Sequence, residues 1–324
     1  MKKLISILCV MMLAVSMLTG CGTGATKDNG KISIVTTIFP EYDWVREITK
    51  GNENVELTML LDKGVDLHSF QPTADDIVKV SSCDMFIYVG GESDEWVEDA
   101  LKEATNKDMI VINLLDVLGD SVKEEELVEG MEGEEEEEKS EEEEGPEYDE
   151  HVWLSLKSAE VLCQYISDEL CKIDTDNKET YETNVKEYIA QLDTLDKEYE
   201  AVVSNASVKT VLFGDRFPFR YLVDDYGLDY YAAFVGCSAE SEASFETIKF
   251  LADKTDELGL NAILQIESAD GKIAQTIKDT TKTKSQQILT MDSMQSVTSK
   301  DVSAGATYLG IMQENLSVLS QAIN

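Results

Sequence analysis

An apolar stripe near the middle of the chain limits the folds that this sequence can adopt. Between residues 178 and 203, apolar side chains recur at alternating spacings of four and three residues, with acidic residues and lysines between them. This spacing is typical of one face of an α-helix, which would be about 40 Å long at the usual rise per residue. An ordinary amphipathic helix inside one domain would show the same stripe. Its length and mid-chain position favour a connector, so we expect residues 174–204 to link two lobes. The stripe consists of Tyr181, Val185, Tyr188, Leu192, Leu195, Tyr199 and Val202.

The segments on either side of this helix alternate short β-rich runs with helical stretches. The expected strands cover residues 32–38, 55–61, 85–89 and 109–114 before it, and 210–213, 230–234, 262–266 and 287–290 after it. Such alternation is typical of a parallel sheet with helices on its faces. We therefore predict an α/β fold with two lobes, at residues 32–173 and 205–324, each with a mostly parallel sheet and bridged by one long rigid helix.

The N-terminal residues are typical of a targeting segment. Lys2 and Lys3 form a basic start, an apolar run of about 15 residues follows, and small residues precede Cys21. This order resembles the lipobox of bacterial lipoproteins, in which the cysteine is lipidated. The alternatives are an ordinary secretory signal or a membrane helix, for which the run is short. We expect a lipoprotein signal peptide at 1–20, a lipid on Cys21, a flexible tether at 21–31, and anchoring at the outer face of the cytoplasmic membrane.

A formal net charge of −38 argues against nucleic acid as a partner, because so acidic a chain repels phosphate. Much of this charge is local: residues 124–150 hold sixteen Glu and one Asp against a single lysine. Such a block cannot bury apolar area, so we expect a disordered acidic insertion at residues 124–148. It is either a solvated loop that only repels, or a segment that concentrates cations beside His151.

The cysteine pattern supports neither a disulfide framework nor a structural zinc knuckle. Cys163 and Cys171 lie on one expected helix, about 12 Å apart along its axis, which is too far for a disulfide. The chain contains no CxxC pair. We interpret Cys83, Cys163, Cys171 and Cys237 as small buried apolar residues.

The chain has only two histidines, His68 and His151. Isolated histidines are ordinarily surface residues or satisfied core residues. These two have turn-forming residues and carboxylates as neighbours, and His68 follows an expected strand, where α/β folds place ligands. Imidazole is the commonest nitrogen ligand of transition metals. We therefore hypothesise a metal site shared between two lobes, with both imidazoles on the first lobe and acidic groups on the second.

These motifs resemble those of a known family, the metal-binding lipoproteins of zinc and manganese ABC transporters (cluster A-I solute-binding proteins). The resemblance covers nearly all of the chain after the targeting segment. It implies two α/β lobes bridged by one rigid helix, with the metal in the cleft between them. The matching pieces are His68-Ser69-Phe70-Gln71-Pro72, Asp149-Glu150-His151-Val152-Trp153-Leu154-Ser155, Tyr181-Glu182-Thr183-Asn184, Tyr226-Gly227-Leu228, Met291-Asp292-Ser293 and the last expected helix.

The resemblance also implies a set of ligands. The first, second and fourth ligands of the family fall on His68, His151 and Asp292. The third ligand differs from the family pattern. The turn that carries His or Glu in the family begins here with Gly214-Asp215-Arg216. Asp215 is the nearest carboxylate and our choice for the third ligand. The remaining candidates are Glu240 and Glu242, the weaker alternative Cys237, Arg216 as a residue that orients carboxylates, and Glu267 as a partner of the ligands.

Two imidazoles and two carboxylates suit Zn²⁺ or Mn²⁺ better than Ca²⁺ or Mg²⁺. The family implies a monomeric receptor, not an enzyme, that captures such an ion outside the cell and delivers it to an ABC transporter permease. Four protein ligands would leave no open position for a substrate. The alternatives are a surface adhesin or metal-sensing module that uses the acidic loop, and a metal-dependent hydrolase with Glu267 as general base.

Overall fold

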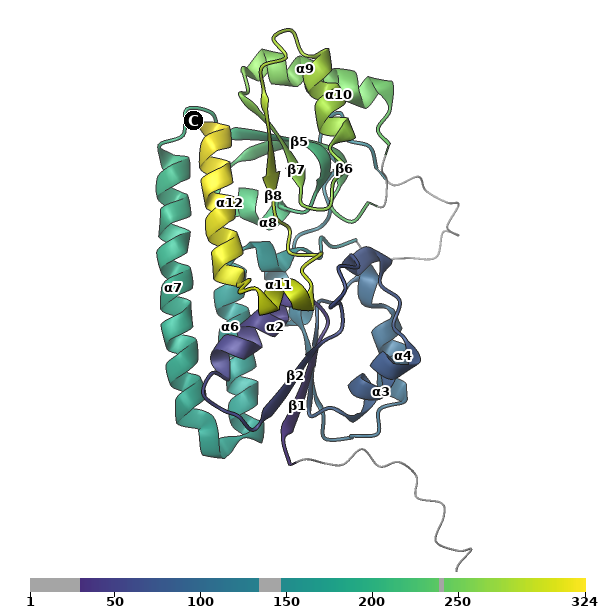
Figure 1. Ribbon diagram of the computed structural model, residues 1–324, viewed down its shortest axis with the longest axis vertical. Helices are drawn as coiled ribbons and strands as arrows, with labels where there is room; N and C mark the ends of the chain where they lie inside the picture. Colours follow the sequence, from purple (N-terminus) through teal and green to yellow (C-terminus); the bar gives the residue numbers. More distant parts are fainter. Residues whose placement is uncertain (1–29, 134–146, 239–241) are drawn as a thin grey trace, which may run out of the picture.

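Two parallel four-stranded sheets form the centres of two lobes (Figure 1). The computed structural model describes residues 30–133, 147–238 and 242–324. The first sheet has the order β2-β1-β3-β4, with β1 (Ile32–Thr36), β2 (Val55–Met59), β3 (Met85–Tyr88) and β4 (Ile110–Asn113). The second has the order β6-β5-β7-β8, with β5 (Thr210–Phe217), β6 (Asp229–Val235), β7 (Ala262–Ile266) and β8 (Gln287–Met291). The predicted α/β fold with two lobes is confirmed.

Helices connect these strands within each lobe, as expected for parallel neighbours. The first lobe contains α2 (Phe39–Ile48), α3 (Ala74–Ser82), α4 (Trp96–Lys102), α5 (Leu114–Leu118) and α6 (Leu156–Ile173). The second contains α8 (Arg220–Tyr226), α9 (Phe245–Leu258), α10 (Lys272–Thr280), α11 (Ser299–Ser303) and α12 (Tyr308–Ile323). None of the helices in the described ranges has the length and apolar composition needed to cross a membrane.

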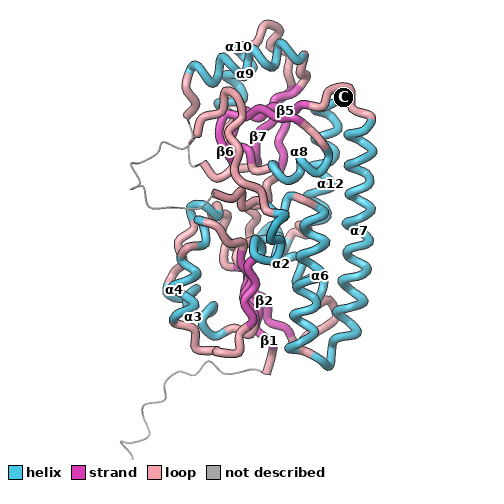
Figure 2. The backbone as a smooth tube through the Cα atoms, turned by 180° about the vertical axis from the view of Figure 1, so that it is seen from behind, coloured by secondary structure: helices cyan, strands magenta, loops and turns pink. Residues whose placement is uncertain are grey.

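The mid-chain stripe forms the long helix α7 (Lys178–Ser204). Its apolar face is buried as predicted, except that Val203 rather than Val202 is buried at its end. This face packs on α2 and α6 of the first lobe and on α8 and α12 of the second. Figures 1 and 2 show α7 running along both lobes. One continuous helix therefore joins the lobes and resists bending between them.

Buried polar contacts add to this connection. The hydroxyl of Tyr308 on α12 donates a hydrogen bond of 2.6 Å to the backbone carbonyl of Trp153. The indole of Trp153 donates one of 2.9 Å to the carbonyl of Ser293, in the loop after β8. Both aromatic side chains are fully buried. The loop that carries His151 is therefore attached to two elements of the second lobe.

The structure describes residues 124–133 and 147–148 of the acidic insertion, for which we expected disorder over residues 124–148. Glu132 forms a β-bridge with Phe234 of β6, and Glu126 forms an ion pair of 2.8 Å with Arg220 of α8. The side chain of Glu125 accepts a hydrogen bond of 3.2 Å from the backbone N–H of Cys237. Specific partners on the second lobe thus hold residues 124–133, which composition alone did not reveal. Residues 134–146, with most of the glutamate run, lie outside the described residues.

Candidate metal centre

His68 is held in a short 3-10 helix, η1 (Leu67–Ser69), in the loop after β2. Asp66 begins this helix, and its carboxylate accepts a hydrogen bond of 3.0 Å from the backbone N–H of His68. Leu67 is fully buried and fixes the turn to the core. The chain therefore presents the imidazole at the carboxyl edge of the first sheet, where parallel sheets place ligands.

His151 lies just before a second 3-10 helix, η4 (Val152–Leu154), whose three residues are fully buried. The same oxygen of Asp149 accepts hydrogen bonds from the backbone N–H of His151 at 2.8 Å and from its Nδ1 at 3.0 Å. An ionised carboxylate can only accept, so Nδ1 of His151 carries the proton. With the donor hydrogen on Nδ1, Nε2 presents a lone pair.

The two rings face each other through their Nε2 atoms, which lie 3.2 Å apart. On its outer side, Nδ1 of His68 is 2.7 Å from Oγ of Ser93 and 3.6 Å from a carboxylate oxygen of Glu150. With Nδ1 as the donor in both rings, two lone pairs point at one position. This arrangement, with an oxygen partner behind each imidazole, is the usual one for histidines that bind a metal.

Burial shifts the pKa values of His68 and Glu150. Burial, and next the neighbouring His151, lower the pKa of His68 to about 3, so the ring is neutral near pH 7. Burial raises the pKa of Glu150 to about 7, and one of its oxygens has no hydrogen-bond partner. Neutral imidazole is the form that binds a metal ion. His68 is therefore ready to bind without losing a proton.

The second lobe supplies a sulfur atom to this position. The Sγ of Cys237 and the ring nitrogens of His68 and His151 lie within 4.8 Å of one another, the spacing of a potential metal site. Cys237 follows β6 by two residues. Gln295, in the loop after β8, is 2% exposed, and its amide nitrogen is 3.2 Å from Nε2 of His151. Its amide oxygen has no partner.

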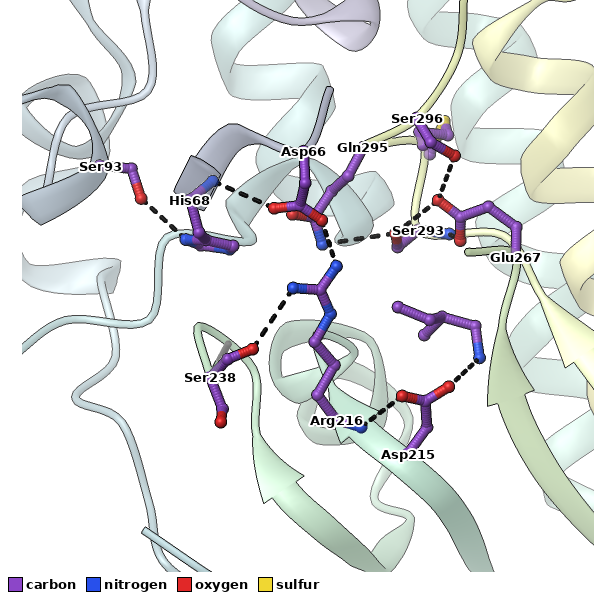
Figure 3. A network of polar contacts seen from close by, with 12 residues as sticks. Asp66, His68, Ser93, Asp215, Arg216, Ser238, Glu267, Ser293, Gln295 and Ser296 are labelled. Carbon is purple, nitrogen blue, oxygen red and sulfur yellow. Dashed lines mark hydrogen bonds and ion pairs between the residues drawn. The ribbon is translucent and has the colours of Figure 1, made fainter. Parts of the chain in front are cut away.

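The structure does not bring Asp215 into this group. We expected a turn at Asp215, but β5 continues through it to Phe217, with an irregularity in pairing between Phe213 and Arg216. The carboxylate of Asp215 accepts hydrogen bonds from the backbone N–H of Arg216 at 2.9 Å and of Ile266 at 3.2 Å. Figure 3 shows it on the far side of Arg216 from His68.

Arg216 itself spans the two lobes. Its guanidinium pairs with the carboxylate of Asp66 and lies 3.4 Å from the backbone carbonyl of Ser238 (Figure 3). We expected this residue to orient carboxylate ligands. Its partner is instead the residue that begins the His68 turn, so Arg216 connects the second lobe to that turn.

Asp292 and Glu267 form a separate acidic group beside the site. Burial, and next the charge of Glu267, raise the pKa of Asp292 to about 7. One oxygen of Asp292 accepts a hydrogen bond of 2.7 Å from the backbone N–H of Met294, and Glu267 binds the backbone and hydroxyl of Ser293. Neither carboxylate belongs to the group formed by the imidazoles and Cys237. Both stabilise the loop that carries Gln295.

Two predicted site residues lie outside the described residues: Glu240, an alternative ligand, and Cys21, the expected lipidation site. Glu242 is described and is exposed. The residues that sequence reasoning undervalued are Cys237, which we ranked as a weak alternative, and Gln295, which we did not consider. Both follow strands of a parallel sheet at its carboxyl end, as His68 does, and this shared position was the available signal.

Comparisons with known proteins agree with this fold. The family described as zinc-uptake complex component A, periplasmic (ZnuA), matches residues 34–322. The zinc-binding lipoprotein AdcA of Streptococcus pneumoniae is 32% identical over 328 residues, which cover 99% of this chain and 61% of AdcA. The high-affinity zinc uptake system protein ZnuA of Bacillus subtilis is 32% identical over 313 residues, which cover 95% of this chain and 94% of that protein.

Among solved structures, the Zn(II)-bound ZnuA-like domain of Streptococcus pneumoniae AdcA aligns with a TM-score of 0.71 and 28% identity. The alignment covers 91% of this chain and 99% of that domain. The present chain thus spans only 61% of the length of whole AdcA but nearly all of its ZnuA-like domain. The match to residues 34–322 includes both sheets and the long helix. The chain therefore belongs to the ZnuA family of periplasmic zinc-uptake components.

Proposed function

We propose that this protein is a lipid-anchored receptor outside the cytoplasmic membrane that binds a divalent transition metal ion and delivers it to the permease of an ABC importer. The observation that carries this proposal is the pair of Nε2 atoms of His68 and His151, which face each other at 3.2 Å. Such a pair attracts a cation that can accept both lone pairs. Imidazole ligands suit zinc, and relatives are named for zinc binding and zinc uptake. Zinc is therefore the first candidate for the cargo, and manganese the second.

The surroundings of the imidazoles support the binding and transport of a metal ion rather than catalysis. His151 is fully buried, and groups of both lobes surround the position that the two rings face. A hydrolase would need a general base free to take a proton from a bound water. Glu267, the base we considered, accepts hydrogen bonds of 2.7 Å and 2.9 Å from Ser293 and 3.1 Å from Ser296. Its oxygens are occupied in holding a loop.

The proposed function also gives a role to the lipid anchor and to the acidic insertion. A lipid on Cys21 would keep the receptor at the membrane surface, next to the permease that takes up the ion. The ordered start of the insertion, at Glu125, contacts the backbone of Cys237 directly. The glutamates that follow in the sequence would attract cations by their combined field.

The test measures metal content and affinity in the full chain, purified in mild detergent. We expect elemental analysis to find one zinc ion per chain, and calorimetry to show tight zinc binding that His68→Ala and His151→Ala each reduce strongly. Circular dichroism of the metal-free variants checks that they remain folded. Unchanged affinity in both folded variants would reject the site and the proposed function. A chain without residues 134–146 should still bind zinc, whereas a role carried by the acidic loop would be lost.

A further inference from the structure

We propose that Cys237 is a direct ligand of the transported ion, with Gln295 as the fourth donor, and that this sulfur makes the site select zinc over manganese. The inference rests on the proposed function, because it names the ligands and the selectivity of the same site. It differs from the set of two imidazoles and two carboxylates that the sequence resemblance implied. The loop after β6 would thereby replace the segment around Asp215 as the source of the third ligand.

The position of Cys237 is the first support. Its Sγ completes a three-membered group with the two imidazoles, in which the ligand atoms lie within 4.8 Å of one another. The cysteine comes from the second lobe and both histidines from the first, so an ion held by all three would join the lobes. A carboxylate could have filled this role, but none among the described residues joins the group.

The carboxylates expected as ligands have other partners. Asp215 uses its two oxygens on the backbone N–H groups of Arg216 and Ile266. Asp292 holds the turn at Met294, whose backbone has a positive φ of 63°, an unusual conformation for a residue with a side chain. Moving either carboxylate to the imidazoles would break these hydrogen bonds. The sulfur of Cys237 already lies beside the imidazoles. It gives up only the hydrogen bond of its thiol to the side chain of Glu125 when the proton leaves.

Gln295 gives an independent indication of a ligand. Its side chain is 2% exposed, its nitrogen lies 3.2 Å from Nε2 of His151, and its oxygen has no hydrogen-bond partner. An unpartnered buried amide oxygen costs free energy unless a ligand satisfies it. A half-turn of the amide exchanges its nitrogen and oxygen. The oxygen would then point toward the position that both imidazoles face, as a metal ligand must.

Binding through Cys237 converts a thiol into a thiolate. The Sγ–H bond breaks, its proton leaves to the solvent, and the electron pair left on sulfur forms the bond to the ion. Nothing is oxidised or reduced, and the only co-reactant is the divalent ion. Thiolate and imidazole suit zinc, whereas manganese prefers carboxylate and water oxygens. The sulfur therefore separates two ions that a site of imidazoles and carboxylates would bind more equally.

The experiment replaces the cargo with cobalt(II) in the full chain, purified in mild detergent. We expect a sulfur-to-cobalt charge-transfer absorption in the near ultraviolet, which Cys237→Ser removes and the matched control Cys171→Ser retains. Cys171 is a partly exposed cysteine on α6, in the first lobe. Gln295→Leu should weaken binding but keep the absorption. Zinc affinity should fall more than about 100-fold in Cys237→Ser, because the loss of a mere partner of a ligand already costs about 10–100-fold. Manganese affinity should fall less.

A second measurement needs no variant. X-ray absorption of the zinc-loaded wild-type chain should show a sulfur neighbour at about 2.3 Å. A shell of nitrogen and oxygen alone, or a charge-transfer absorption that persists in Cys237→Ser, would overturn this inference. The proposed function would survive that result as long as His68→Ala and His151→Ala still abolish zinc binding. Failure of the wild-type chain to bind zinc or cobalt would reject the inference together with the proposed function.

Discussion

Gly236 lies so close to His151 that a β-carbon at position 236 would come within 3.0 Å of Cε1 of the imidazole. The same β-carbon would lie 2.9 Å from the backbone carbonyl of Phe217. That oxygen belongs to β5 and cannot turn away, so the imidazole or the loop after β6 must move. Because Gly236 has no side chain, the imidazole of His151 can lie this close to the second lobe.

We expect Gly236→Ala to lower zinc affinity by about tenfold, since displacing the ring resembles the loss of a group that orients a ligand. The free energy of unfolding of the metal-free protein should fall by about 1–3 kcal/mol through overpacking. Calorimetry and urea unfolding measure the two effects. The control is Gly133→Ala, where the new β-carbon meets only the flexible end of Leu127 at 3.3 Å. Equal affinities in both variants would contradict the assigned role of Gly236.

The second prediction concerns Asp149, whose single oxygen holds both the backbone and Nδ1 of His151. Asp149→Asn keeps the size of the side chain but removes the charge that fixes the ring's proton on Nδ1. We expect zinc affinity to fall about 10–100-fold, the usual effect of losing a partner behind a ligating histidine. Calorimetry provides the measurement, and the exposed Asp120, replaced by Asn, serves as the control. An unchanged affinity would show that Asp149 does not set the state of His151.

The third prediction follows from the two facing lone pairs of His68 and His151. A bound ion satisfies both, so zinc should stabilise the folded chain, whereas unfolding separates the ligands. At a free zinc concentration 100 times the dissociation constant, the free energy of unfolding should rise by about 2.7 kcal/mol. Thermal unfolding with zinc and with a chelator tests this, and His151→Ala should show almost no difference between the two conditions. A wild-type midpoint that zinc leaves unchanged would argue against this site.

The strands and helices of the fold could be predicted because each one follows a local pattern in the sequence. The stripe from Tyr181 to Tyr199 repeats a helical period, and α7 buries those residues as predicted. The expected strand at 262–266 matches β7. Such patterns are readable because each strand or helix buries one face, and burial repeats with the period of the backbone.

The site was only partly predictable, because its ligands come from loops whose course depends on distant contacts. The two histidines were rare enough to single out, and the structure does bring them together. The choice of Asp215 assumed that the chain turns at Gly214, whereas pairing with β6 extends β5 to Phe217. No local pattern could place Gln295 beside His151, since a chain distance of 144 residues separates them.

The fourth prediction concerns the pH dependence of stability, through Asp43 on α2. This carboxylate is fully buried, pairs with Arg46, and accepts a hydrogen bond of 2.7 Å from the backbone N–H of Tyr308. Burial outweighs the favourable charge of Arg46 and raises the pKa of Asp43 to about 6. Below the pKa of the unfolded state, near 3.8, Asp43 is protonated in both the folded and the unfolded chain. It then carries no charge, so its burial does not lower the free energy of unfolding. As the pH rises through 6, the folded protein must bury a charge that the unfolded chain exposes to water, so stability is lost.

We therefore expect Asp43→Asn to be more stable than wild type at pH 7, by at most about 3 kcal/mol at roughly 1.4 kcal/mol per pKa unit. The advantage should shrink steadily from pH 6 to pH 4.5, where the wild-type carboxyl becomes protonated and resembles the amide. Urea unfolding in the presence of a chelator measures the difference without interference from the metal site. Asp168→Asn, at an exposed position on α6, should differ little from wild type at any pH. If Asp43→Asn were less stable than wild type at pH 7, the ion pair with Arg46 would outweigh the cost of burial, and the sign of this contribution would be reversed.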